Sequence, residues 1–163
     1  DHINPMLIGT NSSKLDISSE KQTKIISEKL SNYLANGDIV YLFGNIGSGK
    51  TTFVKYLINH LQQKYKENVL EIPSPTFNIL NEYKVKNLEI LHYDLYRLKS
   101  IKELKNIGHI KHHKDKLIFV EWPEMLKKNV LNLIILNFEY EDNFNKRSLT
   151  ITSRNKKLID EFK

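Results

Sequence analysis

The sequence predicts an α/β fold in which a mostly parallel central sheet is flanked by helices and an antiparallel strand pair lies at the C-terminus. Compact runs of β-branched and apolar residues alternate along the chain with amphipathic segments of helical period, which is the order that builds parallel sheets. Capping residues, glycines and prolines mark the ends of these segments. No repeat or low-complexity linker interrupts the 163 residues, so we expect one domain.

The first half of the chain contains the clearest helix signals. Ser19 and Gln22 form a capping box that predicts the start of a helix, and Gly37 suits its end. The expected apolar face of this helix is Ile25, Ile26, Leu30, Tyr33 and Leu34. The other elements expected here are a lead-in strand at 13–18, a buried strand at 38–43 and a helix at 51–66.

The second half is predicted to be mainly strands. Pro73 and Pro75 exclude a helix and predict an extended loop. Ser100 with Glu103 is a second capping box, which predicts a short helix that ends at Gly108. The expected strands are 77–84 and 88–93, joined by a turn at 86–87, then 117–121, 130–140 and 148–153, before a short basic helix at 154–162.

The composition excludes several classes of protein. Hydrophobic residues make up 40% and charged residues 27%, and no apolar run approaches the roughly 18–20 residues of a membrane helix. The absence of Cys excludes disulfide frameworks, zinc fingers and cysteine nucleophiles. The opening residues lack the layout of a signal peptide, so we expect a cytoplasmic protein that does not contact membranes. Residues 1–5, ahead of Met6, are interpreted as a cloning remnant, which leaves 6–163 as the expected domain.

The net charge of +6 raises the question of nucleic-acid binding. Only Arg97, Arg147 and Arg154 among the 25 basic residues are arginines, whereas base readout and phosphate forks favour arginine. A solvated basic surface is therefore favoured, and an RNA-binding domain that uses its lysines stays an alternative. The histidines at 109, 112 and 113 have a spacing that suits a metal, but the surrounding lysines favour a solvated basic face.

One motif carries specific chemistry. Residues 44–51, GNIGSGKT, match G-x-x-x-x-G-K-[ST] at every fixed position, between a predicted strand and a predicted helix. Glycines let backbone N–H groups surround phosphate oxygens, and the helix N-terminus adds its positive dipole. The sequence therefore predicts a P-loop NTPase. The residues expected at the nucleotide are Asn45, Ile46, Gly47, Ser48, Gly49, Lys50, Thr51 and Thr52.

A P-loop needs an acidic partner at a neighbouring strand end to hold the metal or its water. Asp94 and Glu121 each end a predicted strand, and in open α/β sheets ligands bind beyond the carboxyl ends of the strands. Spacing alone does not separate the two, and either can also be an ordinary strand-end carboxylate. The tyrosines at 83, 93 and 96 are interpreted as sheet and core aromatics.

The motifs of the sequence distinguish between several kinds of nucleotide-binding protein. GTP specificity is disfavoured, because Asp94 is followed by Leu-Tyr-Arg rather than x-x-Gly and no Asn-Lys-x-Asp occurs. A small-molecule or nucleotide kinase stays an alternative, although such enzymes use several arginines and only Arg97 is well placed. A nucleotide-binding module without turnover is a further alternative.

Three more motifs follow the P-loop in order: SPTF at 74–77, HYDLYRL at 92–98 and EWPE at 121–124. Together they resemble the TsaE (YjeE) family of bacterial P-loop ATPases, from about residue 18 to residue 154. Asn45, Ile46 and Ser48 depart from the commoner Asp-Leu with Ala, which leaves the phosphate cradle intact.

The resemblance implies an ATPase that uses ATP and Mg²⁺ to support threonylcarbamoylation of adenosine 37 in tRNA. It implies a TsaB–TsaD heterodimer as the protein partner and only indirect contact with tRNA. By the same resemblance, Thr51 and Glu121 would bind Mg²⁺ and Lys50 the terminal phosphates. The remaining implied roles are a switch threonine at Thr76, a catalytic or water-positioning acid at Asp94, and contacts to the nucleotide from Trp122 and Glu20.

Overall fold

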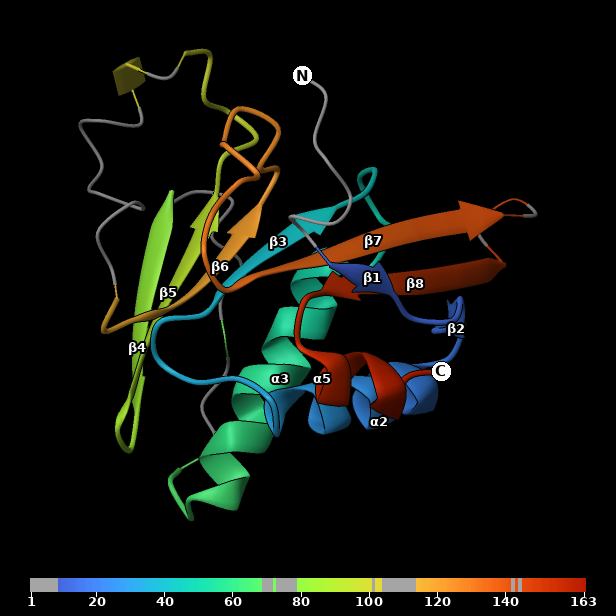
Figure 1. Ribbon diagram of the computed structural model, residues 1–163, viewed down its shortest axis with the longest axis horizontal. Coiled ribbons are helices and arrows are strands. Elements are labelled where there is room, and N and C mark those ends of the chain that lie inside the picture. Colours follow the sequence, from blue (N-terminus) through green and yellow to red (C-terminus); the bar gives the residue numbers. More distant parts are fainter. Residues whose placement is uncertain are drawn as a thin grey trace.

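An eight-stranded sheet forms the centre of the molecule (Figure 1). The computed structural model describes residues 9–68, 72, 79–100, 102–103, 114–141, 143 and 145–163. The strands are β1 (Thr10–Asn11), β2 (Leu15–Asp16), β3 (Ile39–Phe43), β4 (Leu80–Val85), β5 (Leu88–Asp94), β6 (Leu117–Glu121), β7 (Leu133–Glu141) and β8 (Lys146–Ser153). Their order in the sheet is β1-β8-β7-β3-β6-β5-β4, and β2 also pairs with β8.

The four central strands β5, β6, β3 and β7 are all parallel. On the outside, β4 is antiparallel to β5 and β8 is antiparallel to β7. The expected mostly parallel sheet with an antiparallel C-terminal pair is therefore confirmed. Parallel strands place all their carboxyl ends at one edge of the sheet, and this edge holds the loop that follows β3.

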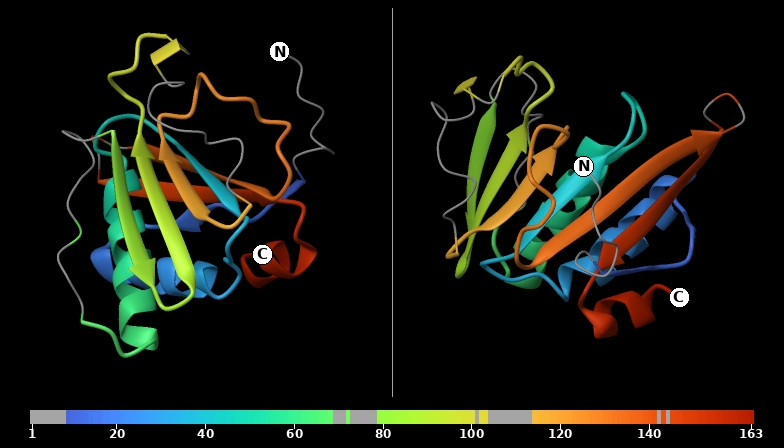
Figure 2. Two further views of the ribbon diagram at one scale, coloured as in Figure 1. Left: turned by 90° about the vertical axis from the view of Figure 1, so that its left-hand side faces the viewer. Right: turned by 45° about the horizontal axis from the view of Figure 1, so that its top comes forward.

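Three helices lie on one face of the sheet: α2 (Glu20–Ser31), α3 (Lys50–Lys64) and α5 (Lys156–Glu161) (Figures 1 and 2). The helices and this face of the sheet share one apolar core, which includes Leu30, Phe53 and Leu158. In the described part of the chain, the second face is covered by loop residues instead, among them Leu95, Trp122 and Met125. No described helix is long and apolar enough to cross a membrane.

Helix α2 begins as predicted and ends earlier than predicted. The Ser19 Oγ accepts from the Gln22 N–H at 3.1 Å, and the Gln22 side chain accepts from the Ser19 N–H at 3.1 Å, so the capping box is present. The helix ends at Ser31, because the next residues bond to carbonyls three positions back, so the prediction that Gly37 ends it was wrong. Gly37 instead adopts φ +102° and donates to the Lys116 carbonyl at 2.7 Å, ahead of β3.

The apolar face of α2 also needs a correction. Ile25, expected in the core, is 43% exposed, whereas Thr23, Ser27 and Ser31 are buried beside Leu30. The hydroxyls of Ser27 and Ser31 bond to backbone carbonyls of their own helix, which satisfies them without water. Small, self-satisfied side chains thus occupy the buried face, and α2 packs against α3.

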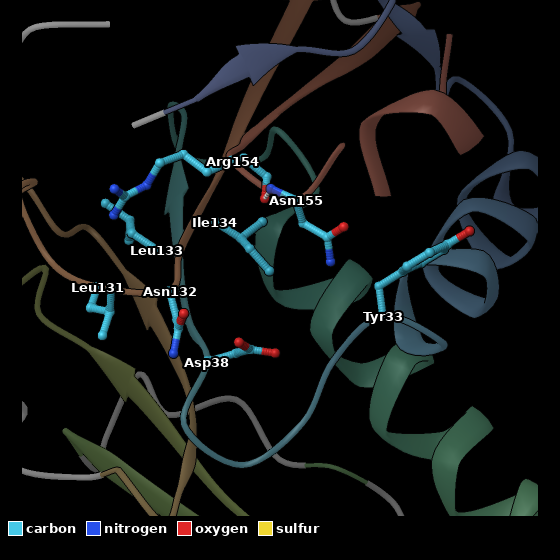
Figure 3. Close-up of a pocket in the computed structure, with 9 residues that line it drawn as sticks. Tyr33, Asp38, Leu131, Asn132, Leu133, Ile134, Arg154 and Asn155 are labelled. Atoms are coloured by element: carbon cyan, nitrogen blue, oxygen red, sulfur yellow. Dashed lines mark hydrogen bonds between the residues drawn. The ribbon is translucent and has the colours of Figure 1, made fainter. Parts of the chain in front are cut away.

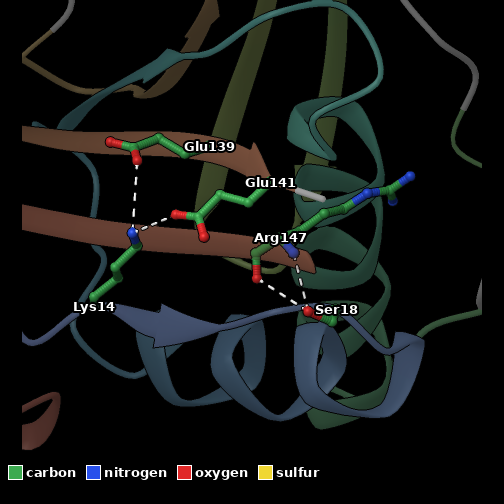
Figure 4. A network of polar contacts seen from close by, with 5 residues as sticks. All are labelled: Lys14, Ser18, Glu139, Glu141 and Arg147. Carbon is green, nitrogen blue, oxygen red and sulfur yellow. Dashed lines mark hydrogen bonds and ion pairs between the residues drawn. The ribbon is translucent and has the colours of Figure 1, made fainter. Parts of the chain in front are cut away.

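The N-terminal segment is tied to the strand pair of β7 and β8 by polar contacts (Figure 4). Lys14 Nζ lies 2.8 Å from Glu141 Oε1 and 3.9 Å from Glu139 Oε2. Ser18 Oγ accepts from the Arg147 N–H at 3.0 Å. The short lead-in strand predicted at 13–18 is therefore confirmed as β2, paired with β8.

Candidate functional site

The loop between β3 and α3 has the backbone of an anion-binding site. Gly47 and Gly49 adopt φ values of +82° and +107°, and a Cβ built on either would meet nothing within 4 Å. Both glycines therefore border open space next to the first N–H groups of α3, which have no partner within the helix. Gly44 differs, because a Cβ there would lie 2.6 Å from Ser48 Oγ and 2.8 Å from the Phe138 carbonyl oxygen. Ser48 Oγ is itself buried with no hydrogen-bond partner among the described residues.

Lys50 lies at the base of this loop with only 5% of its surface exposed. Its ammonium donates to the Gly44 carbonyl and lies 3.4 Å from the centre of the Trp122 ring. Burial lowers the pKa of Lys50, and the carboxylates of Glu121, Glu124 and Asp94 oppose that shift. A desolvated ammonium beside the N–H groups of a helix start suits the charge of a phosphate.

The Glu121 carboxylate contacts residues of both α3 and β5. Its Oε1 accepts from Thr51 Oγ1 at 2.6 Å, and its Oε2 lies 2.6 Å from His92 Nε2. The side chains of His92 and Glu121 are 0% and 3% exposed. Strand β6 carries Glu121 to this place because β6 lies directly beside β3, so both strands end next to the P-loop.

Asp94 lies opposite Glu121 in the register of β5 and β6. Burial raises the pKa of Asp94, the Tyr96 N–H that donates to Oδ1 at 3.0 Å lowers it, and the Glu121 charge raises it further. The two acids that the sequence left as alternatives are thus neighbours at one edge of the sheet, and only Glu121 bonds to Thr51.

Trp122 adopts φ +59° immediately after Glu121, and its ring contacts both the Lys50 ammonium and the Tyr96 ring. The Tyr96 and Trp122 rings are 4.8 Å apart at an interplanar angle of 49°. Tyr96 is 54% exposed, so its interpretation as a core aromatic was wrong, whereas Tyr93 is buried as expected. Tyr96 leaves the core because β5 ends at Asp94 and the chain turns there.

The described contacts of Glu20, which was also predicted at this site, are made to other residues. Glu20, in the first turn of α2, accepts from the Tyr56 hydroxyl of α3 and lies 3.7 Å from Lys24 Nζ. Thr76, the rest of the SPTF segment and the histidines at 109, 112 and 113 lie outside the described residues. The roles of Glu20 and Thr76 stay predictions.

A cavity of about 380 Å³ lies elsewhere (Figure 3). Its lining includes Asp38, which precedes β3, Leu131 and Asn132, which precede β7, and Tyr33 and Asn155. The amino ends of the parallel strands β3 and β7 lie at the edge opposite their carboxyl ends. This cavity is therefore separate from the P-loop.

Comparison with known proteins identifies the family. The family model of "Threonylcarbamoyl adenosine biosynthesis protein TsaE" matches residues 17–149. The chain belongs to the TsaE family. A TsaE protein of Rickettsia conorii is 41% identical over 146 residues, covering 89% of this chain and 81% of the relative. The TsaE protein of Aquifex aeolicus is 35% identical over 135 residues, with 83% and 92% covered.

A solved structure has the same overall architecture. The crystal structure of Bacillus subtilis YdiB matches with a TM-score of 0.62 and 21% identity, covering 99% of this chain and 97% of that one. At this identity the likeness shows the fold. The α/β architecture with a mostly parallel central sheet, as predicted from the sequence, is confirmed for this TsaE-family chain.

The residues at the TsaE P-loop fit a hard cation bound together with a phosphate. Thr51 and Glu121 offer oxygen atoms, which Mg²⁺ prefers, and Mg²⁺ commonly takes one or two protein ligands beside phosphates and water. Among the described residues no group of three His, Cys, Asp or Glu side chains forms a self-sufficient metal site. Sequence reasoning missed His92, although its alternation with Asp94 along one strand places both on one face.

Proposed function

We propose that this chain is a cytoplasmic, Mg²⁺-dependent ATPase that supports a TsaB–TsaD pair in the threonylcarbamoylation of adenosine 37 of tRNA. The observation that carries the proposal is the hydrogen bond from Thr51 to the buried Glu121 carboxylate, beside the desolvated Lys50 at the start of α3. This is the residue set with which P-loop enzymes hold a nucleotide and its metal. Membership of the TsaE family supports the link to tRNA modification.

Each residue of the set has a separate task in this proposal. Lys50 exchanges its contacts with Gly44 and Trp122 for phosphate oxygens, and the N–H groups of residues 45–52 surround those oxygens. Thr51 and Glu121 hold the metal ion, which when bound with ATP supplies charge stabilisation at the transferred phosphoryl group. Asp94 orients the attacking water and accepts its proton, a task that a carboxyl of raised pKa suits.

The proposal includes slow hydrolysis by the chain alone. Phosphoryl transfer to water needs positive charge near the γ-phosphate beyond Lys50 and the metal, and an arginine finger supplies roughly 10³–10⁵ in rate. The chain has three arginines, none of them in the P-loop or the SPTF segment. The protein partner is therefore proposed to complete the site, while contact with tRNA stays indirect.

The test is steady-state phosphate release at saturating ATP and Mg²⁺, with and without purified TsaB–TsaD. We expect slow release by the chain alone and a rate at least tenfold higher with the pair. Lys50→Met is the control, because it keeps the length of the side chain and removes the charge. Fast release that the pair leaves unchanged would show that the site is complete within this chain. No release under either condition would point to a binding module.

A further inference from the structure

The proposed function does not use the contact between the imidazole of His92 and the Glu121 carboxylate. His92 lies in the middle of β5, fully buried, and its Nε2 is 2.6 Å from Glu121 Oε2. The other carboxylate oxygen, Oε1, accepts from Thr51 at 2.6 Å. We propose that His92 is a positioning residue that fixes the Glu121 carboxylate for the metal ion, a role that rests on the proposed function.

The two nitrogens of His92 indicate the direction of this hydrogen bond. Glu121 Oε2 is a carboxylate oxygen and accepts, so Nε2 carries the hydrogen and donates. Nδ1 is buried and has no hydrogen-bond partner among the described residues. The donor to Glu121 is therefore Nε2.

The sheet itself holds this geometry. His92 is the register partner of Phe119, and Glu121 follows Phe119 by two residues on the same face of β6. The backbone pairing of β5 and β6 thus sets the separation of the two side chains. Packing around a fully buried ring leaves His92 little rotational freedom, so its N–H is a fixed point against which the carboxylate is oriented.

Glu121 needs such a fixed point because its carboxylate is buried. A glutamate has three side-chain torsions, and a carboxylate removed from water requires donors at both oxygens. The bond from His92 to Oε2 leaves the other carboxylate oxygen, Oε1, facing Thr51 in the first turn of α3. Partners that orient a metal ligand in this way typically change metal affinity 10–100-fold when they are removed.

The test uses a matched pair of variants, His92→Gln and His92→Met. The two new side chains have similar length, and only the glutamine has an N–H for Glu121 Oε2. The dissociation constant of the ATP analogue AMP-PNP is measured by calorimetry in EDTA and again across a Mg²⁺ titration. Mn²⁺ EPR on the AMP-PNP-bound chain gives a second readout of the metal that does not depend on turnover. Ile90→Val, a buried change on the same face of β5, is the control for packing.

We expect His92→Met to weaken Mg²⁺ binding to the AMP-PNP-bound chain about 10–100-fold while the constant in EDTA stays the same. His92→Gln should recover most of the metal affinity, and Ile90→Val should behave like the unaltered chain. If His92→Met does not fold, His92→Phe takes its place, because phenylalanine keeps a ring and lacks the N–H donor. The expected loss of Mg²⁺ affinity and the unchanged constant in EDTA are then the same.

Unchanged Mg²⁺ affinity in the folded His92→Met or His92→Phe variant would overturn the positioning role. An equal loss of AMP-PNP affinity in EDTA would also overturn it, because this would show a general structural effect. A failure of the proposed function would be seen in the unaltered chain itself, which would then bind AMP-PNP without any dependence on Mg²⁺.

Discussion

Asp94 lies directly opposite Glu121 across the pair of parallel strands β5 and β6, at the carboxyl end of each strand. Register partners project from the same face of a sheet, so the two carboxyl groups share one site. Glu121 has hydrogen-bond partners at both of its oxygens, from Thr51 and His92. Asp94 has the Tyr96 N–H, and burial raises its pKa. Two neighbouring acids are thereby placed in different environments, which suits different tasks.

The first prediction separates these tasks. Glu121→Gln should remove most of the gain in AMP-PNP affinity that Mg²⁺ provides, because it replaces a carboxylate ligand with an amide. Asp94→Asn should keep that gain and lower the rate of ATP hydrolysis by about 10²-fold, as expected for loss of a general base. Calorimetry and phosphate release measure the two effects. If Mg²⁺ dependence is lost only in Asp94→Asn, the two roles must be exchanged.

The second prediction concerns Lys50. The ammonium is buried, and burial lowers its pKa, so Lys50→Met removes a desolvated charge while it keeps the aliphatic stem against Trp122. The thermal midpoint of the ligand-free chain should therefore not fall. ATP at 100 times the dissociation constant should stabilise the unaltered chain by about 2.7 kcal/mol and the variant hardly at all. Thermal denaturation with and without ATP and Mg²⁺ tests this, and equal stabilisation of both chains would contradict the P-loop assignment.

The third prediction concerns the start of α2. Ser19→Ala removes the side-chain acceptor for the Gln22 N–H, and the loss of an N-cap should lower the free energy of unfolding by about 1 kcal/mol. Ser19→Asp keeps an acceptor and serves as the matched control. Urea denaturation measures both variants. A loss as large in Ser19→Asp as in Ser19→Ala would show that the cap is not the cause.

The fourth prediction is a pH dependence of stability at Asp38. Burial raises the pKa of Asp38 above 3.8, and the Ala35 N–H partly opposes this. The folded state then binds the proton more tightly than the unfolded state, so stability falls as the pH rises from 3.8 through the raised folded value. Asp38→Asn keeps an acceptor for Ala35 and should gain stability, relative to the unaltered chain, as the pH rises.

Asp16→Asn is the control for that experiment, because its effect on stability should change with pH in the opposite direction to that of Asp38→Asn. Hydrogen bonds from Ser18 and Gln22 lower the pKa of Asp16, so its charge stabilises the fold above pH 3.8 and this contribution is lost in acid. The variant should therefore lose stability relative to the unaltered chain at neutral pH. Urea denaturation across the acid range measures both variants. If the free energy of unfolding changes with pH in the same way in Asp38→Asn and Asp16→Asn, these two carboxyl groups are not the source of the pH dependence.

The strands and the P-loop were predictable because their signals are local. Strand β6 has the bounds that the sequence predicted, because a short apolar run buried on both faces is typical of a strand in a parallel sheet, and α3 follows the P-loop motif. The contact of His92 with Glu121 joins residues 29 positions apart, and it exists only because β5 and β6 are adjacent and parallel. The end of α2 and the exposure of Ile25 also depend on tertiary packing, because α2 places small residues against its neighbour.

The N-terminal segment pairs with the outer edge of β8, which reduces the strand edge that is open to another molecule. An uncovered edge strand exposes N–H and C=O groups that can pair with another molecule and start aggregation. Here Ser12 and Ser18 accept from the N–H groups of Ile151 and Arg147, and the pairing of β1 and β2 occupies the rest of β8. Residues 9–16 lie outside the part of the chain that matches the family model. Their pairing with β8 leaves fewer of its N–H and C=O groups open to edge-to-edge association, and β7 separates β8 from β3 and the P-loop.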